Sequence, residues 1–153
     1  MYQPLSAGDL CTRDTVVAPR TMALTEAARL MRERHVGSVV VVDEGAGGRR
    51  PAGLLTDRDI VTAVVARDVD LRTLRVEDVM NPEPVTVREQ DSMFDALGAM
   101  RRHGVRRVVV TDARGVLQGV LALDDLIELV AEQMRSIAQA LSSGRAQELK
   151  RRP

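Results

Sequence analysis

The tetrapeptide Thr56-Asp57-Arg58-Asp59 places a hydroxyl and a carboxylate three residues apart, directly after the apolar stretch Gly53–Leu55. We expect that stretch to be a short strand and the residues that follow it to begin a helix. Backbone N–H groups are free at a helix N-terminus, and the helix dipole favours anions there. A hydroxyl there can donate a hydrogen bond to a bound anion, and a carboxylate can accept hydrogen bonds from hydroxyl groups. The alternative is purely structural, with Thr56 as the helix cap and Asp59 as a first-turn acid.

The other reactive side chains do not form a recognisable catalytic or metal site. Catalysis by a Cys–His pair needs spatial contact and a third orienting group, and nothing in the sequence brings Cys11, His35 and His103 together. Their spacing does not match a zinc site either, so we expect no enzyme, no resident metal and no cofactor. Magnesium is expected only with a bound di- or triphosphate, near the acidic residues Asp57, Asp59, Asp124 and Asp125.

Composition excludes several classes of partner. Lys plus Arg and Asp plus Glu both number 22, so the formal net charge is zero and no global field favours nucleic acid or anionic lipid. Aromatic residues, which single-stranded nucleic acid stacks on, make up 1% of the chain. The single cysteine fits a reducing compartment, the N-terminus has no apolar signal region, and the longest apolar run, Val39–Val42, cannot span a membrane. We therefore expect a cytoplasmic protein that binds neither nucleic acid nor membrane.

The elements that position these residues occur twice. When the chain is shifted by 69 residues, Ala7–Asp43 aligns without a gap on Val76–Asp112, with ten identities in 37 positions. The sequence pattern of each copy predicts, in order, a short strand (residues 15–17 and 84–86), an amphipathic helix, a buried strand, a glycine turn, a second short strand and a second helix. The order is β-α-β-β-α, twice. Thr21 and Asp91 are the N-caps we expect for the two amphipathic helices.

The sequence predicts that the second helix of the second copy is longer than its counterpart in the first copy. Its apolar positions continue beyond the end of the repeat, and an apolar face without an intramolecular partner usually contacts another chain. We expect a homodimer through this helix; the alternative is that the helix folds back on its own repeat. The series consists of Leu126, Ile127, Val130, Met134, Ile137 and Leu141. The predicted organisation is repeat 1 at 6–67, a solvated linker at 68–75, repeat 2 at 76–134, and a C-terminal helix extension with a frayed basic tail at 135–153.

Two pairs of segments carry a family resemblance. VGSVVVVD followed by GLLTDRDI, and VRRVVVTD followed by GVLALDDL, resemble the paired CBS domains of a Bateman module. The resemblance implies an α/β (α+β-like) fold of two pseudo-twofold units. It also implies clefts between the units that bind AMP, ADP, ATP, NAD or S-adenosylmethionine.

The resemblance also implies a binding site built crosswise from both repeats. Thr56 and Asp59 match the family's ribose and phosphate motif, and Arg58 is expected to assist them. The adenine slot then comes from the second copy, as Pro84, Val85, Thr86 and Val105. Arg106 and Arg107 stand where related modules bind phosphate, which suits the bidentate guanidinium. The alternative for these two arginines is a solvated strand start that pairs with nearby acids.

The second copy departs from the pattern. Asp125 keeps the ribose position, but Ala122 replaces the threonine and removes a donor. The second cleft, expected to consist of Val16, Val36, Gly37, Ser38 and Asp125, also lacks the arginine pair. We expect it to be weaker, differently selective or empty.

The function that the resemblance implies is regulatory. A nucleotide bridging the two copies shifts their packing and signals to an unidentified partner protein. The alternative is a ligand-free structural module whose role is dimerisation.

Overall fold

The computed structural model describes residues 4–152, and its first sheet comes from the first repeat. Strand β2 (Ser38–Gly45) lies between β1 (Val17–Pro19) and β3 (Gly48–Thr56). It is parallel to β1 and antiparallel to β3. Four consecutive valines, 39–42, lie buried in β2, as expected for β-branched residues in a strand covered on both faces.

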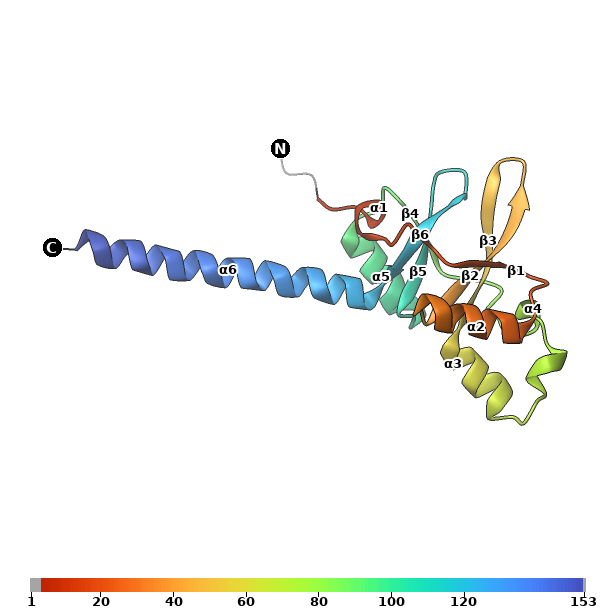
Figure 1. Cartoon of the computed structure of the whole chain (residues 1–153). Coiled ribbons are helices and arrows are strands. Elements are labelled where there is room, and N and C mark those ends of the chain that lie inside the picture. Colours follow the sequence, from red (N-terminus) through yellow and green to blue (C-terminus); the bar gives the residue numbers. More distant parts are fainter. Residues whose placement is uncertain (1–3, 153) are drawn as a thin grey trace.

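The second sheet repeats this arrangement. Strand β5 (Arg107–Thr111) lies between β4 (Thr86–Arg88), which is parallel to it, and β6 (Leu117–Ala122), which is antiparallel. A small cluster centred on Val40 and Val109 packs the two sheets against each other. The α/β fold class and the tandem pseudo-twofold arrangement are therefore confirmed (Figure 1).

The first strand of each copy lies two residues later than predicted, at 17–19 and 86–88 instead of 15–17 and 84–86. Both amphipathic helices are present, as α2 (Leu24–Arg34) and α5 (Met93–His103), but neither predicted N-cap is correct. The N-cap of α2 is Ala23, which has no side-chain acceptor, and that of α5 is Ser92.

Two four-residue helices were missed, α1 (Ala7–Leu10) and α4 (Val76–Val79). Each packs against the sheet of the other repeat. Helix α1 buries Ala7 fully in the core of the second sheet, and α4 buries Val76 fully in the core of the first. Each sequence repeat therefore gives its first helix to the other packed unit.

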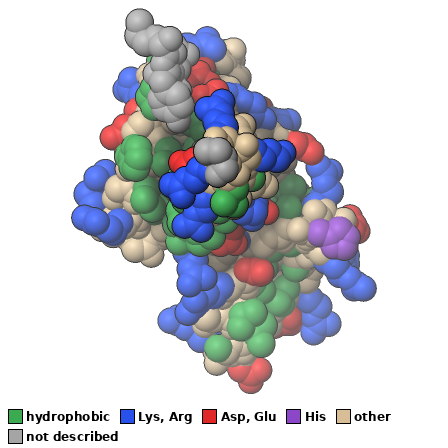
Figure 2. Space-filling view, turned by 90° about the vertical axis from the view of Figure 1, so that its left-hand side faces the viewer, with side chains coloured by type: hydrophobic (Ala, Val, Ile, Leu, Met, Phe, Trp, Pro, Cys, Tyr) green, Lys and Arg blue, Asp and Glu red, His purple; other side chains and the backbone are tan. Residues whose placement is uncertain are grey.

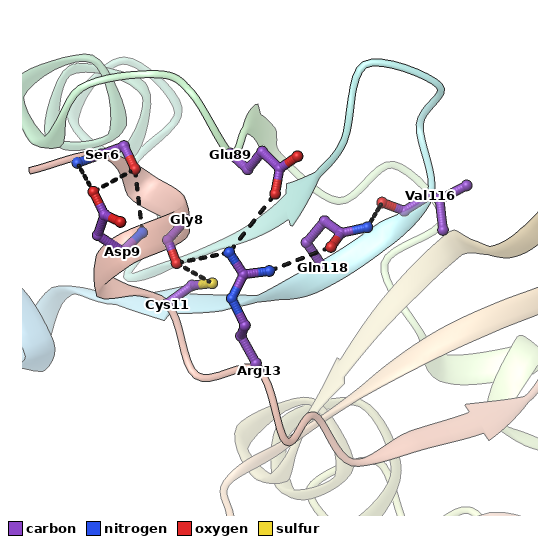
Figure 3. Close-up of polar contacts among 8 residues, drawn as sticks. All are labelled: Ser6, Gly8, Asp9, Cys11, Arg13, Glu89, Val116 and Gln118. Atoms are coloured by element: carbon purple, nitrogen blue, oxygen red, sulfur yellow. Dashed lines mark hydrogen bonds and ion pairs between the residues drawn. The ribbon is translucent and has the colours of Figure 1, made fainter.

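Polar contacts fix the crossing N-terminal segment to the second unit (Figure 3). The guanidinium of Arg13 donates to the Gly8 carbonyl at 3.0 Å and to Oε1 of Gln118 at 3.3 Å, and lies 3.7 Å from the Glu89 carboxylate. The backbones of Thr12 and Val120 also hydrogen bond to each other at 2.9 and 3.1 Å. Leu54 and Asn81 make the matching bridge on the opposite side, so the crossing obeys the pseudo-twofold relation.

The segments after β3 and after β6 differ. After β3 the chain forms α3 (Asp57–Ile60), a wide π-type turn (Val61–Val65) and a 3₁₀ turn (Leu71–Thr73). The predicted linker is thus partly structured, and Leu71 and Leu74 pack on the first core.

After β6 the chain forms one continuous helix, α6 (Leu123–Arg151), of 29 residues. The predicted frayed tail is helical as far as Arg151, and Pro153 lies outside the described residues. The helix projects from the body and does not fold back on its repeat (Figure 1). None of the helices within residues 4–152 combines the length and apolar character needed to cross a bilayer.

Candidate functional site

The start of α3 forms a reciprocal helix cap. The Asp59 N–H donates to Thr56 Oγ1 at 3.1 Å, and the Thr56 N–H donates to Asp59 Oδ2 at 2.9 Å. Thr56 and Asp59 therefore do cap the helix, as the structural interpretation expects, but the cap leaves some of their hydrogen-bonding atoms without a partner. The hydroxyl proton of Thr56 remains a donor, and within the described residues Asp59 Oδ1 accepts no hydrogen bond.

A cavity of about 190 Å³ opens beside this cap, and both repeats line it. Its walls include seven of the nine residues predicted for the main site. Leu54 and Asn81 were missed, although their mutual backbone bridge mirrors that of Thr12 and Val120 and follows from the repeat. The complete lining is Leu54, Thr56, Asp59, Asn81, Pro84, Val85, Val105, Arg106 and Arg107.

Two predicted residues lie elsewhere. Thr86 is exposed on β4 and lines a separate hollow beside Arg88 and Asp112. Arg58 is exposed, and its backbone N–H donates to Oδ1 of the neighbouring Asp57 at 2.8 Å. The structure does not bring either residue to the main cavity, since successive side chains on a strand point to opposite faces and Arg58 lies on the outer side of the helix start.

The second cleft is a cavity of about 360 Å³, and all five predicted residues line it. The Ala122 N–H donates to Asp125 Oδ2 at 2.9 Å, as in the first cleft, but Ala122 offers no side-chain acceptor in return. The cleft is formed by Thr12, Asp14, Thr15, Val16, His35, Val36, Gly37, Ser38, Val40, Arg107, Val120, Ala122, Asp124 and Asp125.

Arg107 lines both cavities, which corrects the expectation that the second cleft has neither arginine. It is the first residue of β5 and pairs with Ala122, the N-cap residue of α6. Gly37 makes room for it: a Cβ at position 37 would lie 3.2 Å from Arg107 Nη2 and 3.3 Å from Asp57 Oδ2. The second cleft is thus not free of cationic groups, and the two cavities share one side chain.

The two cavities nevertheless differ in charge. The first has one carboxylate, Asp59, with Arg106 and Arg107. The second has three carboxylates, Asp14, Asp124 and Asp125, with Arg107 as its one arginine and His35 as a further basic side chain. Arg34 lies 3.8 Å from Asp14 but outside the lining, and therefore offsets the excess only in part. Guanidinium groups bind phosphate strongly, so the first cavity suits an anionic ligand better.

The lone cysteine lies outside both cavities. Its thiol donates to the Gly8 carbonyl at 3.5 Å, and burial raises the pKa of Cys11 (Figure 3). A raised pKa keeps the sulfur protonated, which makes it a poor nucleophile. Within residues 4–152 no group of three or more His, Cys, Asp or Glu side chains is placed to hold a metal ion.

Known proteins match this chain over most of its length. The family model for the CBS domain matches residues 7–66 and again residues 76–132. The CBS domain-containing protein YhcV of Bacillus subtilis is 34% identical over 121 residues, which cover 79% of this chain and 82% of YhcV.

Solved structures agree with these matches. The CBS domain protein PAE2072 from Pyrobaculum aerophilum, complexed with AMP, is 32% identical, with a TM-score of 0.70 over 82% of this chain and 98% of that one. The cytosolic domain of the Mg²⁺ channel MgtE, in complex with ATP, is 28% identical, with a TM-score of 0.68 over 84% of this chain and 50% of that one. Because the CBS domain model matches two consecutive segments, and a relative and a solved structure of this family are each more than 30% identical over most of the chain, the chain belongs to the CBS-domain family as a tandem pair.

Proposed function

We propose that this chain is a regulatory module that binds an adenosine nucleotide in the cavity beside Asp59. The observation that carries the proposal is the meeting of one carboxylate and two arginines from opposite repeats in one cavity. The related structures solved with AMP and with ATP support the class of ligand. No catalytic step is part of the proposal, and a cytoplasmic location, where such nucleotides occur, belongs to it.

The chemistry of the cavity suggests how the ligand lies. Asp59 Oδ1 is free to accept from the vicinal hydroxyls of a ribose, while the Thr56 hydroxyl can donate to ribose or phosphate. Pro84, Val85 and Val105 give the apolar surface that an adenine ring needs. Arg106 and Arg107 then face the phosphates. Magnesium enters only with a di- or triphosphate.

Signalling follows from the crosswise construction. A ligand that touches Asp59 of one repeat and Arg106 of the other stabilises one arrangement of the two units. The shift it causes is limited by its difference in affinity for the two arrangements. The output passes to a partner protein.

One observation favours a second candidate function. The mutual hydrogen bonds of Thr56 and Asp59 account for both residues without any ligand. A ligand-free dimerisation module, assembled through the exposed face of α6, would need nothing further from this motif.

A thermal-shift screen with AMP, ADP, ATP, NAD and S-adenosylmethionine separates the two functions. A ligand present at 100 times its Kd should stabilise the folded chain by about 2.7 kcal/mol. Isothermal titration should then give the stoichiometry of the ligand that raises the Tm most. The absence of any shift with all five compounds at millimolar concentration would favour the ligand-free module.

A further inference from the structure

Helix α6 carries an apolar seam that no part of the described chain covers. Its side chains recur at alternating spacings of three and four residues, the pattern of a coiled-coil interface. All are between 51% and 66% exposed, so each can contact a partner. Figure 1 shows the helix projecting beyond both sheets. The seam consists of Ile127, Val130, Met134, Ile137 and Leu141.

Charge is divided unevenly along the same helix. Its first three turns are acidic, while its last two turns are basic except for Glu148. Figure 2, which faces the free end of α6, shows basic side chains gathered around that end. The acidic residues are Asp124, Asp125, Glu128 and Glu132, and the basic ones are Arg145, Lys150 and Arg151, with Arg152 directly after the helix.

We propose that α6 pairs with α6 of a second copy of this chain in antiparallel orientation. An antiparallel pair places the acidic first turns of each helix beside the part of the other helix that carries Arg145, whereas a parallel pair places the acidic turns of both helices side by side. At 1.5 Å per residue the 29-residue helix is about 44 Å long, so its acidic first turns and its basic last turns are well separated along the pair.

The seam fixes the register. Antiparallel packing pairs Val130 with Leu141 of the second copy and Met134 with Ile137 of the second copy, and the twofold axis repeats both layers. Ala131 then faces Ala138 of the second copy, and these small side chains allow a close approach. A cavity of about 250 Å³, lined by Val130, Met134 and the 71% exposed Phe94, lies beside these layers and offers room for the partner's leucine and isoleucine.

The same register brings a charge to the second cleft. Asp124, which lines that cleft, flanks the seam at the position that faces Arg145 of the second copy. The pair would supply a cation at the mouth of a cavity with three carboxylates of its own. This last step rests on the proposed nucleotide binding, but the pairing of the helices does not.

Sedimentation equilibrium tests the pairing without any nucleotide. The full chain should be a dimer at micromolar concentration. Ile137→Asp should give a monomer, with an unchanged circular dichroism spectrum below 250 nm in its sheet and helix bands, because the side chain is exposed. Ser136→Asp, on the opposite face of the same turn, is the matched control and should stay dimeric. A monomeric wild-type chain, or a dimer unaffected by Ile137→Asp, would overturn the proposal.

Disulfide trapping tests the orientation. In a Cys11→Ala background, a mixture of Val130→Cys and Leu141→Cys chains should form a cross-linked heterodimer, while neither chain alone should cross-link with itself. Self-linking of the single variants would show a parallel pair. A dimer that cross-links in neither way would place the interface elsewhere, and either result would refute the antiparallel register.

A charge swap tests the contact at the cleft. Asp124→Arg should weaken the dimer roughly tenfold, since two attractive surface pairs become repulsive, and adding Arg145→Asp should restore it. Arg135→Asp, which lies off the seam, should have a smaller effect. Failure of the double variant to recover would reject the Asp124–Arg145 contact. Nucleotide titrations of the same variants report on the cleft separately, so a chain that binds no nucleotide leaves the helix pairing still testable.

Discussion

The two clefts share one backbone design but differ in chemistry. In each, a helix start places an aspartate whose Oδ2 accepts from the backbone N–H three residues earlier, at 2.9 Å in both cases. Both clefts contain Arg107, but the first adds the Thr56 hydroxyl and Arg106, whereas the second has Ala122 and an excess of carboxylates. Symmetry of the fold therefore fixes where a ligand could lie, while a few side chains decide which ligand each cleft can accept.

The largest expected difference between the clefts comes from their aspartates. Asp59→Asn keeps an oxygen that can accept from the Thr56 N–H but removes the charge that ribose hydroxyls would meet. We expect nucleotide affinity to fall by roughly 10- to 100-fold, since hydrogen bonds to charged groups contribute about 1.5–3 kcal/mol. Isothermal titration measures the change.

Asp125→Asn is the matched control, because its backbone contact is the same. It should leave the main binding event unaltered. If Asp125→Asn abolishes binding and Asp59→Asn does not, the nucleotide occupies the other cleft.

Substituting the arginines should change nucleotide affinity by a smaller factor, and the two substitutions should affect the clefts differently. Arg106 lines only the first cavity, while Arg107 lines both. Arg106→Ala should therefore weaken only binding at the first cleft, by roughly tenfold for a lost charged hydrogen bond. Arg107→Ala should alter every binding event that the titration resolves. Equal effects of the two variants at a single site would show that Arg107 does not link the cavities.

Sequence reasoning predicted the residues around the candidate cavity better than the local structure near them. The repeat and the family motif placed Thr56, Asp59 and the arginine pair in one cleft, because those depend on strand order. The double role of Arg107 was not predictable, since the path of a long side chain depends on what Gly37 leaves open.

The helices that were missed have a common physical cause. A four-residue helix has almost no stability of its own, and α1 and α4 exist because Ala7 and Val76 are buried in the opposite unit. The cap of α2 was misassigned for a related reason. Ala23 has no side chain that signals a cap, and its backbone is held by a bridge to Arg75, far away in the sequence.

The helix caps offer a test of stability rather than affinity. Thr56→Ala removes the acceptor of the Asp59 N–H and should lower the free energy of unfolding by about 1 kcal/mol, the usual value of an N-cap. Ala122→Thr should raise it by a similar or smaller amount, because Ala122 already has the extended backbone of a cap residue. Urea unfolding of both variants measures the difference. A stabilising Thr56→Ala would show that the cap is strained rather than favourable.

The smallest expected effect distinguishes the two amphipathic helices by their response to acid. At the start of α5, Ser92 donates to Asp95 Oδ2 from its hydroxyl at 2.7 Å and from its backbone N–H at 3.0 Å, which lowers the pKa of Asp95. A lowered pKa stabilises the folded state above the pKa of the unfolded chain, about 3.9, and this stabilisation is lost as the pH falls through the folded value.

Ser92→Ala removes the largest cause of that shift. The difference in unfolding free energy between wild type and variant should therefore be greatest at neutral pH and should shrink as the pH approaches 3. Thr21→Ala makes the same kind of change before α2, where Ala23 is the N-cap and, among residues 4–152, the Thr21 hydroxyl has no hydrogen bond to a carboxylate. Its effect should be independent of pH. Urea unfolding at pH 7, 5 and 3 gives both differences, and a constant difference for Ser92→Ala would mean that its hydroxyl does not control the ionisation of Asp95.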